Sequence, residues 1–348
     1  MSEINPFNIK VKVPQSAAGA ELQHLFRSRY FNLTSGLGYF DVNGDLKFTV
    51  APVFASSADL DIRHFNAYTY ANIAVLKSVT VTAGASYDYL DGAPAHVPHK
   101  QLDQFNPKFG ITWRPLSDTS IRAAAFRVMK RTLSTDQTLE PTQVAGFNQF
   151  FDDVDVTKAW RYGVGIDQKF TKDVFGGIEF SRRDLKIPLI DATVSPPPVT
   201  KVNGTEKLAR HYLFWTPHPW WAFRAGYVFE RFENGLTLGE NAKVDTHHVP
   251  LGVNFFHPGG LSASLNASYY HQSGKFLRIL TPNFESANGD FWTLDAAINY
   301  RLPKRYGFIT VGATNLLDKK FKYFDTDVNN PRIQPDRTFF LKITLALP

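Results

Sequence analysis

Apolar and polar residues alternate again and again along this chain of 348 residues, and this pattern limits its fold most strongly. From Val79 to Tyr89 every odd-numbered residue is apolar or aromatic, whereas the even-numbered residues are Thr, Gly, Ser or Asp. Successive side chains of a β-strand point to opposite faces, so the pattern predicts strands with one apolar and one polar face. The same alternation recurs over residues 105–114, 160–169, 221–230, 261–269, 292–301 and 339–347.

Composition supports an all-β fold and excludes several other classes. The chain holds 30 Phe, 14 Tyr and 6 Trp, which are residues that favour strands. Its apolar runs fall short of the roughly 20 residues that a membrane-spanning helix needs. The absence of cysteine excludes disulfides and thiolate metal sites. The net charge is +6, but Lys and Arg are spread along the chain, so we expect no nucleic-acid partner.

Alternation alone fits a soluble sandwich as well as a membrane barrel, and the connections favour the barrel. Short and long links take turns, as they do between the two ends of an outer-membrane barrel. The predicted fold is therefore all-β: an antiparallel transmembrane β-barrel of about 16 strands (range 14–16), with short periplasmic turns and long extracellular loops. Residues 1–20 form an N-terminal segment with a possible first strand over 7–13, and residues 21–348 form the barrel. The tight links are predicted at 42–45, 115–118, 171–173, 257–260 and 302–305, and the long links at 91–103, 131–157, 188–204, 274–289 and 319–335.

Charged residues on the polar phase of these strands are predicted to face the barrel interior. A Lys or Arg that faces lipid at mid-bilayer costs roughly 2 to 4 kcal/mol. Two interpretations are open for the inward charges: they pair with one another, or they select a small or anionic solute. Residues 143–155, which contain three Phe and three Asp, are predicted to fold into the barrel. The candidates for the interior are Lys108, Arg114, Arg161, Asp167, Lys169, Glu179, Arg183, Arg224 and Glu230.

The sequence gives no basis for covalent chemistry, so we expect no enzyme, no cofactor and no metal. His247 and His248 are adjacent, and adjacent strand residues point to opposite faces, which disfavours a shared metal. His96 and His99 lie in a predicted loop, where solvated polarity explains them. Some outer-membrane barrels are enzymes, but Ser262, which shares a face with other serines, has no histidine predictably beside it.

The C-terminal region resembles that of TonB-dependent outer-membrane receptors. The family's penultimate strand commonly ends in a Gly-x-x-Asn-Leu-x-Asp-Lys stretch and an aromatic residue. Here the corresponding run is Gly312-Ala313-Thr314-Asn315-Leu316-Leu317-Asp318-Lys319-Lys320-Phe321, and Arg337 and Phe339 lead into the closing strand. Residues 139–141 and 160–166 are similar to a further family passage. The resemblance implies a bacterial outer-membrane location, with outer-membrane lipid and the barrel assembly machinery as partners.

This chain departs from the receptor family in three respects. A plug and an energy-coupling box have no room before Leu25, about sixteen strands replace the family's 22, and the chain ends on Pro348 instead of Phe or Trp. Because the start also lacks a signal peptide, we expect a fragment, a processed form or a mis-started gene.

Three functions fit the sequence. The first is a receptor-like or porin-like conduit for solutes. The second is the C-terminal barrel module of an export protein that carries periplasmic helical repeats. The third is a soluble all-β binding protein.

Overall fold

The structure is a computed structural model in which strands dominate, and among the residues that it describes the one helical element is a short 3-10 turn, η1 (Pro303–Arg305). It describes residues 8–12, 14–51, 54–92, 100–131, 138–149, 153, 155–190, 199–235, 241–277, 284–321, 323 and 336–346. The strands are β1 (Asn8–Lys12), β2 (Gln15–Arg27), β3 (Phe31–Ala51), β4 (Phe54–Leu76), β5 (Val79–Gly92), β6 (Lys100–Leu116), β7 (Thr119–Met129), β8 (Gln143–Val144), β9 (Phe147–Asn148), β10 (Lys158–Lys169), β11 (Val174–Ile190), β12 (Val199–His218), β13 (Trp221–Gly235), β14 (Asn241–Phe256), β15 (Leu261–Leu277), β16 (Phe284–Arg301), β17 (Gly307–Thr314) and β18 (Thr338–Leu345).

The chain divides into two compact units. Unit 1 comprises residues 1–112, 123–162 and 184–203, and unit 2 comprises residues 113–122, 163–183 and 204–348. Strands β6, β7, β10, β11 and β12 each contribute residues to both units. Among the described residues, no helix is long and apolar enough to span a bilayer.

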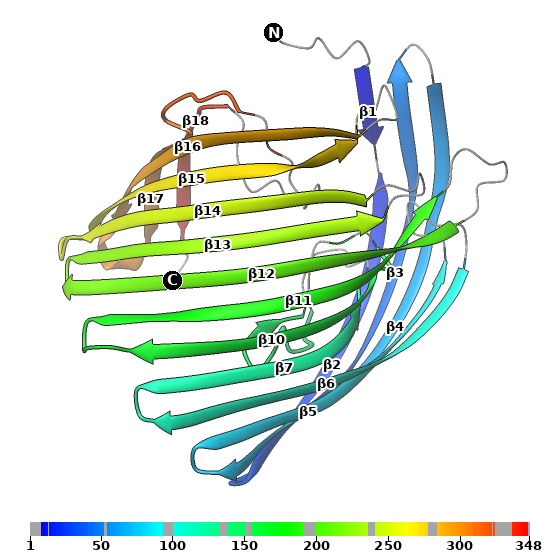
Figure 1. Ribbon diagram of the computed structural model, residues 1–348, viewed down its shortest axis with the longest axis horizontal. Helices are drawn as coiled ribbons and strands as arrows, with labels where there is room; N and C mark the ends of the chain where they lie inside the picture. Colours follow the sequence, from blue (N-terminus) through cyan, green and yellow to red (C-terminus); the bar gives the residue numbers. More distant parts are fainter. Residues whose placement is uncertain are drawn as a thin grey trace. The chain divides into compact units, whose positions relative to one another are not determined.

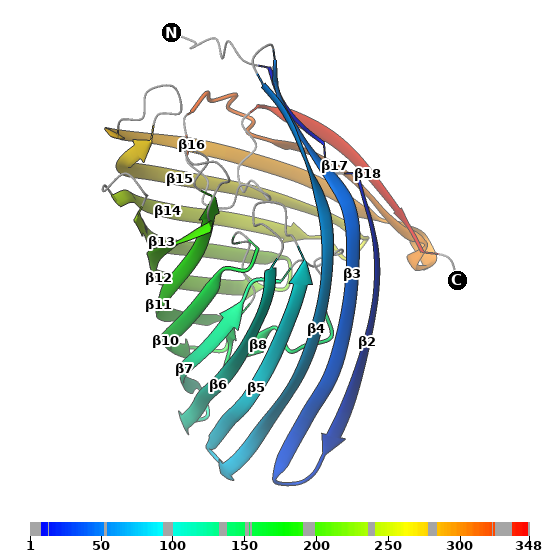
Figure 2. The ribbon, with the colours of Figure 1, turned by 90° about the vertical axis from the view of Figure 1, so that its right-hand side faces the viewer.

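In unit 1, β2, β3, β4 and β5 form an antiparallel series (Figure 2). The predicted first strand is present as β1, but it lies beyond β2 along the same edge of β3. The break between them falls at Pro14, which has no N–H for a strand ladder. With β1 counted separately, the described part of the chain forms one sheet of 16 strands and a two-stranded sheet of β8 and β9.

The prediction of a tight turn at residues 42–45 is wrong, because β3 runs straight through them. Asn43-Gly44 is common turn chemistry. Here, however, Asn43 is opposite Ser16 on β2 and Asp61 on β4, so backbone hydrogen bonding on both sides keeps the segment extended. The tight turn that follows β4 lies instead at residues 77–78.

In unit 2, β12 to β18 follow one another as antiparallel neighbours, and Figure 1 shows β13 to β16 side by side. Short connections at residues 219–220, 257–260 and 302–306 join β12 to β13, β14 to β15 and β16 to β17. The turn after β14 is closed by a hydrogen bond from His257 N to Leu261 O at 2.7 Å.

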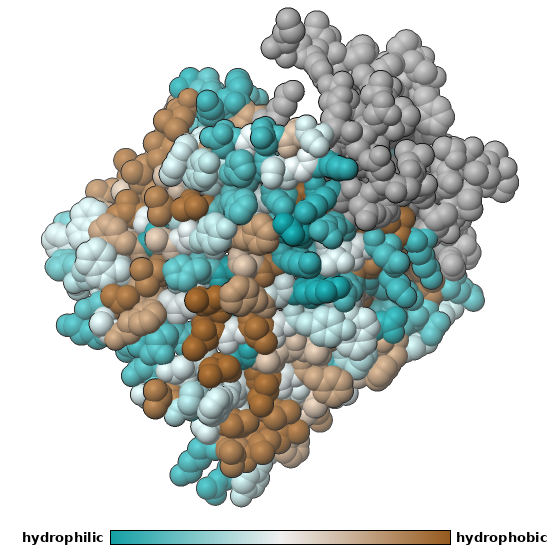
Figure 3. Space-filling view, in the orientation of Figure 1, coloured by the Kyte–Doolittle hydropathy of each residue, from teal (hydrophilic) through white to brown (hydrophobic). Residues whose placement is uncertain are grey.

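The polarity of the strand faces is the reverse of that in a soluble protein. On β6 the polar residues Asn106 and Lys108 are 0% and 2% exposed, whereas Phe105 and Phe109 are each 58% exposed. On β10, Arg161 is likewise buried, between the partly buried Trp160 and the exposed Tyr162. A water-soluble sandwich buries its apolar face, so this arrangement fits strands whose outer face meets lipid. Hydrophobic residues accordingly gather in patches on the surface seen in Figure 3.

The exposed face of β13 carries an apolar band of the height that a bilayer requires. Outward positions from Trp221 to Phe229 are apolar or aromatic, and this span of nine residues agrees with the roughly 9–11 residues of a tilted membrane crossing. Above the band, the next outward position of β13 is Arg231, which pairs with Asp245 at 2.6 Å.

Candidate functional site

The buried face of unit 1 holds a polar cluster around Asp88. This side chain accepts hydrogen bonds from Asn66 Nδ2 at 2.9 Å and Asn106 Nδ2 at 2.7 Å, and His64 Nε2 lies 3.0 Å from it. The four residues come from β4, β5 and β6, and each is at most 3% exposed. Alternation along three paired strands thus brings separate polar residues to one spot.

Gln104 on β6 adjoins this cluster, because its Nε2 donates to Asn106 Oδ1. Three buried side-chain atoms of these residues have no hydrogen-bond partner in the structure: His64 Nδ1, Asn66 Oδ1 and Gln104 Oε1. An unpaired buried polar group costs about 1–3 kcal/mol. These three unpaired atoms therefore make the Asp88 cluster costly to keep buried in this arrangement.

A buried ion pair lies beside this cluster. Arg131 follows β7 and Glu140 lies in the segment after it, and both side chains are 2% exposed. Glu140 also accepts a hydrogen bond from the Tyr70 hydroxyl on β4. Arg131 Nε is 3.9 Å from Asp88 Oδ1, so the ion pair and the Asp88 cluster form one electrostatic group.

The buried face of unit 2 holds a second charged network. Arg122 donates to Asp167 Oδ2 at 2.7 Å and to Glu179 Oε2 at 3.4 Å. Arg210 donates to the same Glu179 oxygen at 3.1 Å, and the Tyr212 hydroxyl donates to Asp167. Because Arg122 bridges two carboxylates and Arg210 shares one of them, the network links side chains of the four adjacent strands β7, β10, β11 and β12.

A separate pair on the same face joins Arg183 Nη1 to Glu206 Oε2 at 2.8 Å. Arg183 is 2% exposed, so the arginine of this pair is shielded from solvent. With the network around Arg122, it makes three arginines and three carboxylates, and the charges balance.

The nine charged residues predicted from the sequence differ in exposure. Lys108, Arg161, Glu179 and Arg183 are buried, while Asp167 and Glu230 are partly buried. Arg114, Lys169 and Arg224 are exposed, and of these Arg224 donates to Asn266 Oδ1 at 2.9 Å. The structure brings Asp167 and Glu179 together through Arg122.

Sequence reasoning missed Arg122 and Arg131 because the alternation is blurred along β7. The buried positions of that strand include Ala124, Phe126 and Val128, which are apolar, so the strand lacks a polar phase. His64, Asn66 and Asn106 were detectable, since each stands on the polar phase of a regular strand.

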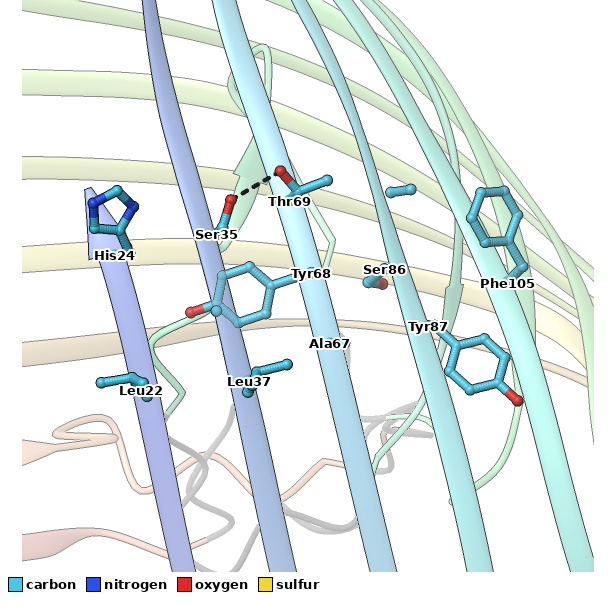
Figure 4. Close-up of a pocket in the computed structure, with 12 residues that line it drawn as sticks. Leu22, His24, Ser35, Leu37, Ala67, Tyr68, Thr69, Ser86, Tyr87 and Phe105 are labelled. Atoms are coloured by element: carbon cyan, nitrogen blue, oxygen red, sulfur yellow. Dashed lines mark hydrogen bonds between the residues drawn. The ribbon is translucent and has the colours of Figure 1, made fainter. Parts of the chain in front are cut away.

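A groove in unit 1 lies on the exposed face. Its volume is about 480 Å³, and small side chains such as Ala67 and Ala85 form its floor between Leu37, Tyr87 and Phe105. Figure 4 shows the groove, with Ser35 hydrogen-bonded to Thr69 at 3.0 Å across β3 and β4. Its composition suits hydrocarbon and offers few contacts to a polar solute.

The predicted terminal motif forms a tight turn after β17. Asn315 has a positive φ of 47°, donates through its backbone N–H to Asp295 Oδ1 at 2.8 Å, and bonds Lys319 through both side-chain atoms at 3.1 Å. Leu316 N donates to Leu294 O on β16. Asp318 Oδ2 lies 3.8 Å from Arg337 Nη2, and Arg337 stacks over Phe339. A hydrogen bond to Asp336 raises the pKa of Lys320, next in the motif.

The adjacent histidines His247 and His248 lie on opposite faces of β14. His247 lies on the exposed face with Nδ1 2.8 Å from the Tyr227 hydroxyl, whereas His248 stacks on Tyr270 on the other face. Within the described ranges, no group of three or more His, Asp or Glu has a metal-binding arrangement. His96 and His99 lie outside the described residues.

Comparison with known families identifies the fold. The model described as "TonB dependent receptor-like, beta-barrel" matches residues 5–316. The chain belongs to the TonB-dependent receptor-like β-barrel family. This membership confirms the predicted all-β barrel and the outer-membrane location. It also contradicts the alternative of a soluble binding protein.

Solved structures support the same receptor-like barrel fold. The FrpB iron transporter from Neisseria meningitidis (F3-3 variant) matches with a TM-score of 0.65 and 14% identity, over 94% of this chain and 54% of that chain. The ferric-catecholate import receptor Fiu from E. coli K12 matches with a TM-score of 0.58 and 13% identity, over 96% and 54%. The ferripyoverdine receptor of the Pseudomonas aeruginosa outer membrane gives 0.59 and 13%, over 89% and 45%.

The receptor-like barrel spans about half the length of these structures. At such low identities the similarity establishes the fold alone. No curated protein matches the chain.

Proposed function

We propose that this receptor-like barrel is the wall of an outer-membrane conduit and that small polar solutes pass along its buried faces. The observation that carries the proposal is the reversed polarity of the strands, with Phe105 and Phe109 exposed and Asn106 and Lys108 buried on one strand. A wall with an apolar outside and a polar inside separates lipid from a hydrophilic path. The nine charged candidates would then line or flank that path.

The paired charges favour size and polarity over net charge as the basis of selection. In unit 2, Arg122, Arg183 and Arg210 are matched by three carboxylates. In unit 1, three basic residues and three carboxylates are likewise buried or partly buried: Lys108, Arg131 and Arg161, and Asp88, Glu140 and Glu21. The anion preference expected from inward basic residues is accordingly weak in this proposal.

Ferric chelates are the first solutes to test, because the descriptions of similar structures name iron, ferric catecholate and ferripyoverdine. We include the outer-membrane lipid and the barrel assembly machinery as partners in the same proposal.

The proposal is tested by refolding the full chain into lipid bilayers and recording ion conductance and the uptake of sugars of graded size. Folded protein is recognised first by heat-modifiable gel mobility. We expect a conductance that does not saturate as the concentration of chloride or of potassium rises. We also expect sugar uptake to stop above a defined solute size. Folded protein that conducts no ions and admits no sugar at any voltage would refute the conduit.

A further inference from the structure

Residues 138–149, here called the strap, cross the buried face of unit 1 without joining its large sheet. Within the described part of the chain, their strands β8 and β9 pair only with each other, through a two-residue turn at Ala145 and Gly146 with φ of 46° and 82°. Both φ values are positive, which is typical of the type I′ turn of a tight hairpin. In the strand order β7 is followed by β10, so the strap can leave without breaking a strand pair of that sheet.

The first half of the strap is held by carboxylates and amides of β2. Glu21 accepts hydrogen bonds from Thr138 Oγ1 and from Leu139 N, both at 2.6 Å. Gln23 donates to the Leu139 carbonyl. Glu140 then forms the buried ion pair with Arg131 described above.

The second half is held by β4, β6 and β10. Lys108 Nζ donates to Gln149 Oε1 at 2.7 Å, and Gln149 Nε2 donates to the Tyr70 hydroxyl at 2.9 Å. Arg161 Nη1 donates to Asn148 O at 2.9 Å. The approach to β6 is close, because a Cβ added at Gly110 would lie 2.7 Å from that of Ala145.

These anchors differ from those of a permanent core segment. Only Val144 and Phe147 are fully buried apolar side chains among the described residues of the strap, and the anchors named above are hydrogen bonds and an ion pair. Polar anchors can exchange their partners for water once the strap moves away, whereas a buried apolar core has no such alternative.

We propose that the strap is a gate that closes the path along the buried face of unit 1 and opens by detaching as one piece. The inference rests on the proposed conduit function and adds its regulation. Tyr70 is the central latch, since its hydroxyl contacts Glu140 from the first half and Gln149 from the second.

The absence of native cysteine makes thiol locking a clean test. In the double variant Gly110→Cys/Ala145→Cys, oxidation would tie the strap to β6, and a shift of about an ångström gives the Cβ spacing of a disulfide. We expect channel openings to stop on oxidation and to return on reduction. The control pair Ser262→Cys/Asn299→Cys bridges directly opposite residues of β15 and β16 in unit 2, and its oxidation should leave conductance unchanged.

A second variant replaces residues 139–148 with a Gly-Ser segment of equal length, after heat-modifiable mobility has confirmed folding. We expect several-fold higher conductance than in the unaltered protein. Equal conductance of the two proteins, together with no effect of the lock, would overturn the gate and leave the conduit standing.

If none of the proteins conducts, the conduit is refuted. Thiol labelling still tests whether the strap covers the buried face of unit 1. In the variant Lys108→Cys the new thiol lies under the strap, so a water-soluble maleimide should label it at least ten-fold faster once the strap is replaced. A cysteine introduced by Ser264→Cys in unit 2 should react at the same rate in both proteins. Equal labelling rates at position 108 would show that the strap covers nothing and would overturn the inference.

Discussion

The guanidinium of Arg131 lies 2.9 Å from the carboxylate of Glu140, and both side chains are only 2% exposed. Removing one partner of such a pair leaves the other charge buried and uncompensated, at a cost of about 3–5 kcal/mol. We expect Glu140→Gln to destabilise the strap by this order and to make residues 138–149 sensitive to protease in folded protein. Asp173→Asn is the control, because its pair with Lys172 is exposed and 3.9 Å long. Equal protease resistance of the two variants would contradict the role of the pair.

Asp88 is expected to be the most sensitive carboxylate of the unit 1 cluster. Asp88→Asn replaces the acceptor of two amide hydrogen bonds with a side chain that also donates, so a charge-assisted interaction worth about 1.5–3 kcal/mol is lost. The measurement is the midpoint of urea unfolding in lipid vesicles. The exposed Asp118→Asn should shift the free energy of unfolding by less than about 0.5 kcal/mol, and a similar small shift for Asp88→Asn would count against the cluster.

A charge placed on the apolar band should interfere with membrane insertion. Leu251 is 40% exposed on β14 and lies between Ala225 and Ala267. Leu251→Lys is expected to cost about 2–4 kcal/mol, whereas Ser273→Lys, beyond the band on the same face, should cost about 0–1 kcal/mol. Folding yield in vesicles of defined thickness compares the two, and equal yields would place the band elsewhere.

Much of this architecture was predictable because the strands are regular where one face meets lipid. The segment from Val79 to Tyr89 alternates without error, and its polar residue Asp88 became the centre of the buried cluster. Prediction failed where a contact between distant strands decides the structure. Asn43-Gly44 looks like a turn in isolation, and only the strands on both sides of it keep it straight.

The partners of the charged residues could likewise not be predicted from the sequence. Alternation assigns Asp167 and Glu179 to the same face, but their shared partner Arg122 depends on the register of neighbouring strands. Glu140 attracted notice only through a loose family similarity, and its burial follows from the strap, whose path no local pattern specifies.

Opposite single substitutions in the unit 2 network should move ion selectivity in opposite directions. Arg122→Gln removes one positive charge from a balanced set and should favour cations, while Asp167→Asn removes one negative charge and should favour anions. Reversal potentials across a salt gradient measure both. Shifts of the same sign, or none in either variant, would separate this network from the conducting path.

Asn315 supplies both an unusual backbone angle and two side-chain hydrogen bonds to the turn after β17. Asn315→Gly keeps the backbone angle and loses the bonds, each worth about 0.5–1.5 kcal/mol. Asn315→Ala loses both contributions and should be the less stable variant. Thermal unfolding of the two proteins gives the order, and the opposite order would contradict the assigned role of the positive φ.

The length of β4 has a consequence at the cell surface. This strand has 23 residues, whereas a tilted membrane crossing takes about 9–11. More than half of it therefore stands clear of the hydrocarbon, and its partner β3, with 21 residues, accompanies it. Antibodies, phages or bacteriocins would meet paired, hydrogen-bonded strands there. An epitope tag placed beyond residues 61–63 would be displayed at the end of these strands.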